Sequence, residues 1–573
     1  MIATLAATLS SPSVQPAFAH ALLGLSVAAL AGAGLRAASP LAAAGLTRAL
    51  VAATLASAAA VAEALALGLF ALGGSTLALS AAALLTWAAA RALLPEPRLR
   101  ISVELVAWWR GLGALQKAGL GALLGAGAAW TAWQLRYPAL GFDTVVYHLP
   151  EIVLWIQHGT PGSIETLIPD QPVGNYPLTA EVTLAWAMGI ARSFVPLTLL
   201  PWAWLVLIAG AGWAGLRALA VGPPERGLAI AALCTSPWLL AWQSNGTITD
   251  PAALAWLVTC AALCALSRAH APLLAPALLA GALSIGSKTT TLPWVLLVLA
   301  IAFWPARARL RSLARPLALA LAASLAVGGV WYLRDLVTHG SPFWPIVAAP
   351  WGDPIPKSIA IVDTSFLDRL GPTIDRIGQD YLDRFGGGIV LLAGGMLAVA
   401  AAGFRDRRVR WASLFVALGF LLWARAPVTG VPAETRLDGV IFSTTRYLLP
   451  VLAGAAVALA LAASGRGAGA LLARVVLAAV VVVNLVQTFD LGFPLAPSAV
   501  TPLVGAAAGA LVALALGVAA GAHLHPRRLR LAPSLRPAAG ALVAAAVACL
   551  LAIPAAGYLA HHGETNPIFT AAV

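Results

Sequence analysis

The 573-residue sequence has few charged side chains and few cysteines. Asp, Glu, Lys and Arg make up 10% of the chain, against about 25% in an ordinary soluble domain. So low a content excludes a soluble enzyme, a disordered chain and a fibrous protein. The four cysteines all lie in apolar runs, without a CxxC or Cys/His cluster. This pattern favours buried apolar side chains over a disulfide or a metal site, and it does not identify the redox compartment.

The sequence contains many long apolar runs, and hydrophobic residues make up 60% of it. Runs of about 20 apolar residues match the thickness of a bilayer, so they predict an all-α polytopic membrane protein of about 16 helices. The net charge of +13 comes from arginines dispersed between these runs. This pattern indicates cytoplasmic loops that follow the positive-inside rule rather than a nucleic-acid-binding surface. The Ala/Leu/Arg-rich composition favours a GC-rich bacterial genome, and hence the bacterial plasma (inner) membrane.

The basic clusters divide the chain into three predicted parts. Residues 1–117 form an N-terminal extension of about three helices and a basic cytoplasmic linker, residues 118–465 a membrane core, and residues 466–573 further transmembrane helices. The first apolar run is followed, not preceded, by a basic residue, which predicts a retained helix with its N-terminus outside. Two loops on the predicted outer side are long, at residues 137–178 and 335–386. Surface helices are expected at residues 179–190 and 363–384.

The segment GFDTVVYHLPEIVLWIQHGTPG, residues 141–162, is the strongest local feature. Asp143 directly follows an outward-crossing helix, which places a carboxylate at the outer membrane interface. Apolar residues then recur at helical spacing, which predicts an amphipathic surface helix with Tyr147, His148 and Glu151 on its more polar side. The alternative interpretation is that Asp143 caps this helix and has no further role.

Other polar residues stand at the predicted outer ends of helices, where charge is costly and indicates function. Lys288, Arg334 and Arg446 all depart from the positive-inside trend. Three cations that converge on one side predict a site for an anionic headgroup, most simply a phosphate or pyrophosphate. The alternative is that each cation pairs with a nearby acid such as Asp335 or Asp438.

The ordered set of motifs resembles the GT-C glycosyltransferases, in the branch of the protein O-mannosyltransferases and the lipid A aminoarabinose transferases. The resemblance covers about residues 118–465, and it is carried by Asp143, His148, Tyr176-Pro177, Lys288, Trp331 to Arg334, Ser341 to Pro345, and Arg446 to Pro450. The sequence departs from the family in three places. Thr144 follows Asp143 where many members have a second acid, Tyr176-Pro177 replaces a Pro-Pro pair, and three additional helices precede the acidic loop.

The resemblance implies a GT-C-like helical bundle that takes a sugar from a polyprenyl-phosphate donor and transfers it, with inversion, on the extracytoplasmic side of the membrane. Asp143 would be the general base, and the cations would stabilise the departing lipid phosphate. The substrate-binding residues expected beside it are His148, Glu151, Tyr176, Asp250, Lys288, Arg334, His339, Arg446 and Tyr447. His339 has an alternative interpretation as a solvated loop histidine.

No cofactor is expected; a divalent metal, used in the oligosaccharyltransferase-like branch, is the alternative. The partners are the bilayer, the lipid-linked sugar and an acceptor (glycan, lipid or protein), with no nucleic acid.

Two other functions fit the same composition. A flippase or transporter of a lipid-linked sugar predicts polar residues spread along a path at mid-bilayer depth. Glu63 is the clearest acid inside an apolar run, whereas the other polar residues gather at one face. A non-catalytic protein of the same fold is the third hypothesis.

Overall fold

The structure is a computed structural model that describes residues 15–42, 44–96, 101–136, 143–165, 167, 172–241, 247–356, 365, 367, 385–400, 406–426, 445–490 and 500–524. Nine helices in this part are long and apolar enough to cross a membrane, and three shorter helices are also apolar. The protein is therefore an α-helical, multi-pass membrane protein, as its composition predicts. The predicted total of about 16 helices includes residues 525–573, which lie outside the described part, and it stays a prediction.

The chain forms two compact units, and the larger one contains every candidate site residue. It combines residues 1–98 with 141–491, whereas the smaller unit combines residues 99–140 with 492–573. The main helices of the larger unit are α2 (Gln15–Ala38), α3 (Gly45–Gly68), α4 (Thr76–Leu93), α7 (Leu149–His158), α8 (Thr179–Ala191), α9 (Val195–Ala218), α10 (Pro223–Cys234), α11 (Pro237–Leu240), α12 (Asp250–Ser267), α13 (Leu274–Ser287), α14 (Leu292–Ala306), α15 (Ala314–Ser324), α16 (Val330–His339), α18 (Arg407–Arg425), α20 (Leu449–Ala463) and α21 (Ala468–Asp490), with a further helix at Phe385–Ala400.

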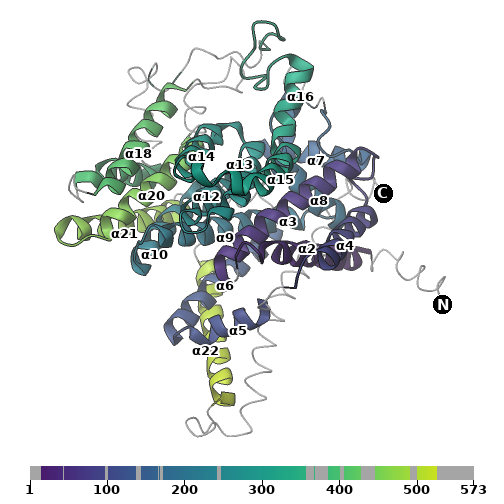
Figure 1. The fold of residues 1–573 in the computed structure, drawn as a ribbon. Coiled ribbons are helices and arrows are strands. Elements are labelled where there is room, and N and C mark those ends of the chain that lie inside the picture. Colours follow the sequence, from purple (N-terminus) through teal and green to yellow (C-terminus); the bar gives the residue numbers. More distant parts are fainter. Residues whose placement is uncertain are drawn as a thin grey trace. The chain divides into compact units, whose positions relative to one another are not determined.

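Helices α12 and α20 lie inside the larger unit. About four-fifths of each is buried in the protein, whereas less than half of every other candidate span in the described residues is buried. Helix α12 contacts α9, α13, α14 and α20, and α20 contacts α10, α18 and α21. On the other flank, α2, α3 and α4 pack together and against α8 (Figure 1). Helices that are apolar all round belong in such a centre, and both of these helices begin at candidate site residues.

Helix α8 corrects one of the predictions. The sequence predicts a helix lying on the outer surface at residues 179–190, and the helix is present. However, all but one of its 13 residues are buried, and it packs against α2, α3, α4, α9 and α13. Its sequence is apolar on every side except for Glu181, so the helix buries its whole circumference in the protein instead of one stripe in the headgroup region.

The segment Arg311–His339 runs for 29 residues as one apolar helical stretch. It comprises a 3-10 turn at Arg311–Leu313, α15, a π-helical turn at Leu325–Gly329 and α16. At a rise of 1.5 Å per residue it is roughly 43 Å long, whereas the hydrocarbon core is about 30 Å thick. One end therefore extends beyond the core or the helix tilts strongly. The C-terminal end of the stretch carries Arg334 and His339.

The structure describes the two predicted outer loops to different extents. The first loop contains α7, preceded by a π-helical turn at Thr144–His148 and followed by a short 3-10 turn at Val173–Asn175. The second loop is described from Asp335 to residue 356. The helix expected at residues 363–384 lies almost wholly outside the described residues and stays a prediction.

The smaller unit consists of α5 (Ile101–Gly111), α6 (Ala114–Arg136) and α22 (Val500–Leu524). Helices α6 and α22 pack along each other (Figure 1). Gly121 and Gly125 face Gly505 and Gly509 so closely that a Cβ atom at any of these four positions would overlap the opposite backbone. Two glycines four residues apart on each helix are the common means of close helix packing in membranes.

Candidate functional site

Four candidate residues form a chain of ion pairs in the larger unit. The Arg446 guanidinium donates a hydrogen bond to Asp143, with 2.7 Å between Nη1 and Oδ2. Its Nε atom lies 3.9 Å from Oδ2 of Asp250, and the same oxygen accepts a 2.6 Å hydrogen bond from Nζ of Lys288. These residues stand before α7, before α20, at the start of α12 and at the end of α13. The predicted outer ends of these helices therefore meet at one place.

Two tyrosines complete this cluster. The Tyr447 ring lies under both cations, 4.7 Å from Nζ of Lys288 and 5.4 Å from Cζ of Arg446. Burial, together with the nearby Tyr447 and Asp143, raises the pKa of Tyr176 to about 12. Tyr176 is therefore a neutral phenol at physiological pH, close to the carboxylate and the aromatic ring.

The Asp143 carboxylate does not cap the helix that follows it. It occupies the N-cap position with helical backbone angles, and its side chain makes no capping hydrogen bond. The interpretation of Asp143 as a cap alone is therefore wrong, because its carboxylate binds Arg446 instead. Burial raises its pKa, but the charge and hydrogen bond of Arg446 outweigh this effect, and the net pKa lies below the ordinary value. Asp143 is thus ionised at neutral pH, as a base must be, but it is held by a cation.

A π-helical turn sets the direction of the side chains after Asp143. The N–H group of Leu149 donates to the carbonyl of Thr144, which closes the wider i to i+5 turn. Such turns are frequent at functional sites because they rotate the following residues relative to an α-helix. Here the side chain of Val145 is 46% exposed, whereas Glu151 is 0% exposed and His148 is buried. His148 and Glu151, on the predicted polar side of this helix, therefore face the protein interior.

His148 and Glu181 form a buried pair beside Asp143. Nδ1 of His148 lies 2.9 Å from Oε1 of Glu181, and both side chains are less than a tenth exposed. His148 also contributes to the lowered pKa of Asp143, which places it in the electrostatic environment of the carboxylate. Glu181 is missing from the set of residues expected from the sequence. Glu181 could have been identified from the sequence, because it is the one charged residue in a largely apolar helix.

Glu151 is the most deeply buried carboxyl group of the region. Both of its oxygens are inaccessible, and neither has a hydrogen-bond partner among the described residues. Burial, together with repulsion from Glu181 and Glu165, raises its pKa to about 9 against the opposing charge of Arg334. Glu151 is therefore a neutral acid at pH 7 rather than a second anion beside Asp143.

Thermal stability is expected to fall as the pH rises, and Glu151→Gln should remove most of this loss. The folded pKa of about 9 lies above the ordinary value of 4.5, so between these limits the folded protein binds one proton more than the unfolded chain. Stability then decreases with pH from about 5 to about 9. Melting temperatures of the detergent-solubilised protein across this range measure the effect. The exposed Glu96 provides the control Glu96→Gln, and parallel curves for wild type and Glu151→Gln would contradict the assignment.

Arg334 lies in a second polar group and makes no ion pair with Asp143. Its Nε donates to Asp335 at 3.0 Å, and its Nη2 donates to the carbonyl of Tyr176 at 3.4 Å. The alternative interpretation, in which each cation pairs with an acid, therefore agrees with the structure for all three cations, since Lys288 also pairs with Asp250 and Arg446 with Asp143. Tyr176 connects the two groups, because its carbonyl binds Arg334 while its phenol lies near Asp143.

His339 is held on three sides and is not a freely solvated loop residue. Its Nδ1 lies 2.8 Å from Asp353, its Nε2 lies 3.0 Å from the amide of Asn175, and its ring stacks on Trp344 at 3.6 Å. Asn175 also donates to Asp335. The loop after α16 is thereby tied to the loop before α8. Neither Asn175 nor Asp353 was expected from the sequence, because their role depends on contacts between distant segments.

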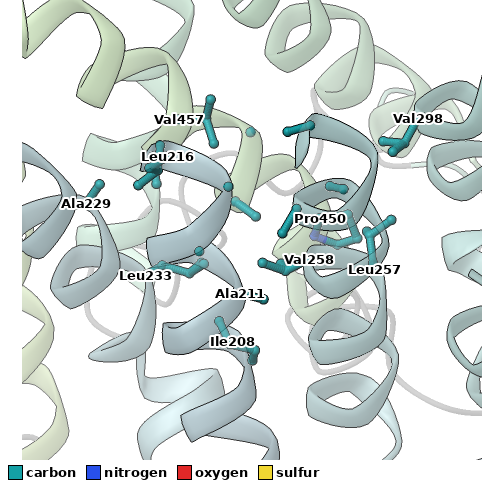
Figure 2. A pocket seen from close by; sticks show the side chains of 18 of the residues that line it. Ile208, Ala211, Leu216, Ala229, Leu233, Leu257, Val258, Val298, Pro450 and Val457 are labelled. Atoms are coloured by element: carbon teal, nitrogen blue, oxygen red, sulfur yellow. The ribbon is translucent and has the colours of Figure 1, made fainter. Parts of the chain in front are cut away.

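A small recess adjoins the ion-pair chain, and a larger apolar cavity shares Pro450 with it as a lining residue. A recess of about 10 Å³ lies between Asp250, Lys288, Arg446 and Tyr447, with room for about one water molecule. An apolar cavity of about 250 Å³ begins at Pro450 and continues between α9, α10, α12, α14, α18 and α20. Figure 2 shows the side chains that line it, which include Leu257, Val258 and Val457. On α12 its lining runs from Leu257 to Ala265, roughly 10 to 22 Å along the helix from Asp250.

Within the described ranges, no group of three His, Cys, Asp or Glu side chains is arranged to hold a metal ion. Glu63, the acid that would favour a transport path, accepts hydrogen bonds from Thr86 and Trp186. No known family model, no curated protein and no solved structure matches this chain.

Proposed function

We propose that this protein is a GT-C-type glycosyltransferase that moves a sugar from a polyprenyl-phosphate donor to an acceptor at the extracytoplasmic face of a bacterial plasma membrane. One observation carries the proposal. An ionised carboxylate is held beside two cations at the start of buried apolar helices, and an apolar cavity that has Pro450 in its lining lies further along the same helices. A base, a phosphate site and a place for a hydrocarbon chain are the three elements that this reaction requires.

In the proposed reaction, the acceptor oxygen attacks the anomeric carbon of the donor sugar. Asp143 takes the proton as the acceptor O–H bond breaks, the new C–O bond forms, and the bond from the anomeric carbon to the phosphate oxygen breaks with its electron pair. The lipid phosphate leaves with an additional negative charge, which Lys288 and Arg446 stabilise. A single displacement of this kind inverts the configuration and needs no covalent intermediate.

In this mechanism Arg446 can bind either the Asp143 carboxylate or the donor phosphate. In the structure it neutralises Asp143, which keeps the pKa of that carboxyl low and the group weakly basic. The recess between the cations is too small for a phosphate group, so donor binding requires the ion pairs to open. When Arg446 turns to the donor phosphate, Asp143 loses its cation and becomes a stronger base. Base activation would thereby depend on donor binding.

The test is turnover by purified, reconstituted protein with a panel of polyprenyl-phosphate sugars, measured as release of polyprenyl phosphate. Lipid-linked donors should react, and sugar phosphates without a lipid chain should not. Ala453→Phe, which fills the apolar cavity below Pro450, should raise KM about tenfold, equivalent to about 1.4 kcal/mol of lost donor binding. The same substitution at the exposed Ala322 on α15 is the matched control. Movement of intact lipid-linked sugar across the bilayer without release of polyprenyl phosphate would favour a transporter instead.

A further inference from the structure

The turn between α3 and α4 lies against the C-terminal end of α7. The backbone N–H of Gly73 donates a 2.8 Å hydrogen bond to the carbonyl of Gly159, which follows α7. Gly159 adopts a left-handed conformation with φ of +74°, which ends the helix. The N-terminal extension is thus bonded directly to the helix that follows Asp143.

Glycines bring the two backbones into direct contact at this point. A Cβ atom added at Gly74 would overlap the backbone of Ile156 in α7, and one added at Gly159 would overlap the backbone of Ala71. A Cβ atom added at Gly73 would overlap the ring of Pro161, and one added at Gly68 would lie tightly against it. Gly73 and Gly74 are buried, whereas Gly68 is half-buried. No side chain separates the turn from α7, so the turn fixes where the C-terminal end of α7 lies.

The same extension is attached to α8. The Trp186 indole donates to Glu63 on α3, and the Thr76 hydroxyl at the start of α4 donates to the carbonyl of Gly189. Since α7 and α8 also pack together, helices α3 and α4 hold the whole segment that carries His148, Glu151 and Glu181.

Asp143 lies at the opposite end of this fixed segment. The π-helical turn Thr144–His148 continues into α7 without a break, so a shift at Ile156 is transmitted along the helix to Asp143. The partner of Asp143, Arg446, stands before α20 instead.

We propose that the α3–α4 turn, through Gly73 and Gly74, is the element that positions Asp143 against the acceptor and Arg446. This inference rests on the proposed function, and it gives the additional N-terminal helices a role in the reaction. The turn is a positioning element because it touches α7 and not the substrate. It predicts that a change at the turn alters the chemical step while leaving the phosphate site intact.

Gly74→Ala in the full-length, reconstituted protein tests the inference. The added methyl group must push α7, so kcat should fall, by up to about 10²-fold for a displacement of about 1 Å. Binding of polyprenyl phosphate, measured directly, should be unchanged, because Lys288 and Arg446 stand on other helices. Gly24→Ala on α2, where an added Cβ meets no atom within 4 Å, is the matched control and should behave as wild type. Equal kcat for Gly74→Ala and wild type overturns the proposal.

Hydrogen exchange provides a second measurement that needs no turnover. In Gly74→Ala, peptides covering residues 143–158 should exchange faster, while peptides from α12 and α20 should not. If Gly74→Ala does not fold, Pro161→Ala, which removes contacts to Gly68 and Gly73 without adding atoms, should give a smaller change at the same peptides. Unchanged exchange over residues 143–158 in the folded variants overturns the positioning role, even if wild type transfers no sugar. Absence of turnover in wild type instead overturns the proposed function.

Discussion

Replacing Asp143 by asparagine is expected to lower kcat by about 10²- to 10⁴-fold, the usual contribution of a general base. Asparagine has the same shape and still accepts a hydrogen bond from Arg446, which binds the carboxylate at 2.7 Å in the wild type. The variant should therefore fold normally. Binding of polyprenyl phosphate should be retained or become tighter, because Arg446 no longer has to leave a carboxylate to reach the phosphate.

Release of polyprenyl phosphate and direct binding of that lipid, both in reconstituted protein, separate these two effects. Asp406→Asn is the matched control, because Asp406 caps α18 and pairs with Arg408 away from the site, and asparagine is an equally good cap. Loss of both binding and turnover in Asp143→Asn would indicate a structural role for the ion pair. Undiminished turnover would remove Asp143 from the catalytic assignment.

The pH dependence of wild-type turnover bears on the same assignment. The pKa of Asp143 lies below the ordinary value, so the free enzyme should keep its base ionised well into the acidic range. A donor-bound enzyme in which Arg446 has turned to the phosphate should show a higher acidic pKa in kcat than in kcat/KM. This difference is the signature of the partner exchange proposed for Arg446.

The starts and ends of helices could be predicted from the sequence. Asp250 begins α12, Lys288 follows α13 and Arg446 directly precedes α20, because polar residues that interrupt apolar runs mark the membrane boundary. The side of the membrane assigned to these ends also predicted that they would meet, and Asp143, Asp250, Lys288 and Arg446 do so.

The orientation of side chains could not be predicted in the same way. Helical spacing assumes 3.6 residues per turn, whereas the π-helical turn at Thr144–His148 rotates the residues after it and directs Glu151 inward. The pairing of Asp143 with Arg446 joins residues 303 positions apart, and no local pattern encodes which cation a carboxylate meets. For Arg334 the sequence left open both convergence with the other cations and pairing with its neighbour Asp335, and the structure shows the pairing.

Replacing Arg446 by glutamine is expected to have the largest combined effect on stability and donor binding. One guanidinium serves both Asp143, at 2.7 Å, and Asp250, at 3.9 Å, and the Arg446 side chain is only 11% exposed. Its removal leaves Asp143 without a cation in a largely buried site, and removal of one partner of a buried pair costs about 3–5 kcal/mol. The melting temperature should fall by several degrees, and binding of polyprenyl phosphate should be lost with the charge.

A double-mutant cycle separates the two effects of Arg446. In Asp143→Asn/Arg446→Gln the uncompensated carboxylate is gone, so much of the lost stability should return, whereas donor binding and turnover should stay lost. Arg408→Gln is the matched control, because Arg408 pairs with Asp406 at 3.0 Å while its side chain is 53% exposed, and exposed pairs contribute about 0–1 kcal/mol. Additive stability losses in the double variant would show that the carboxylate and the guanidinium do not depend on each other. Donor binding that survives in Arg446→Gln would assign the phosphate to Lys288 alone.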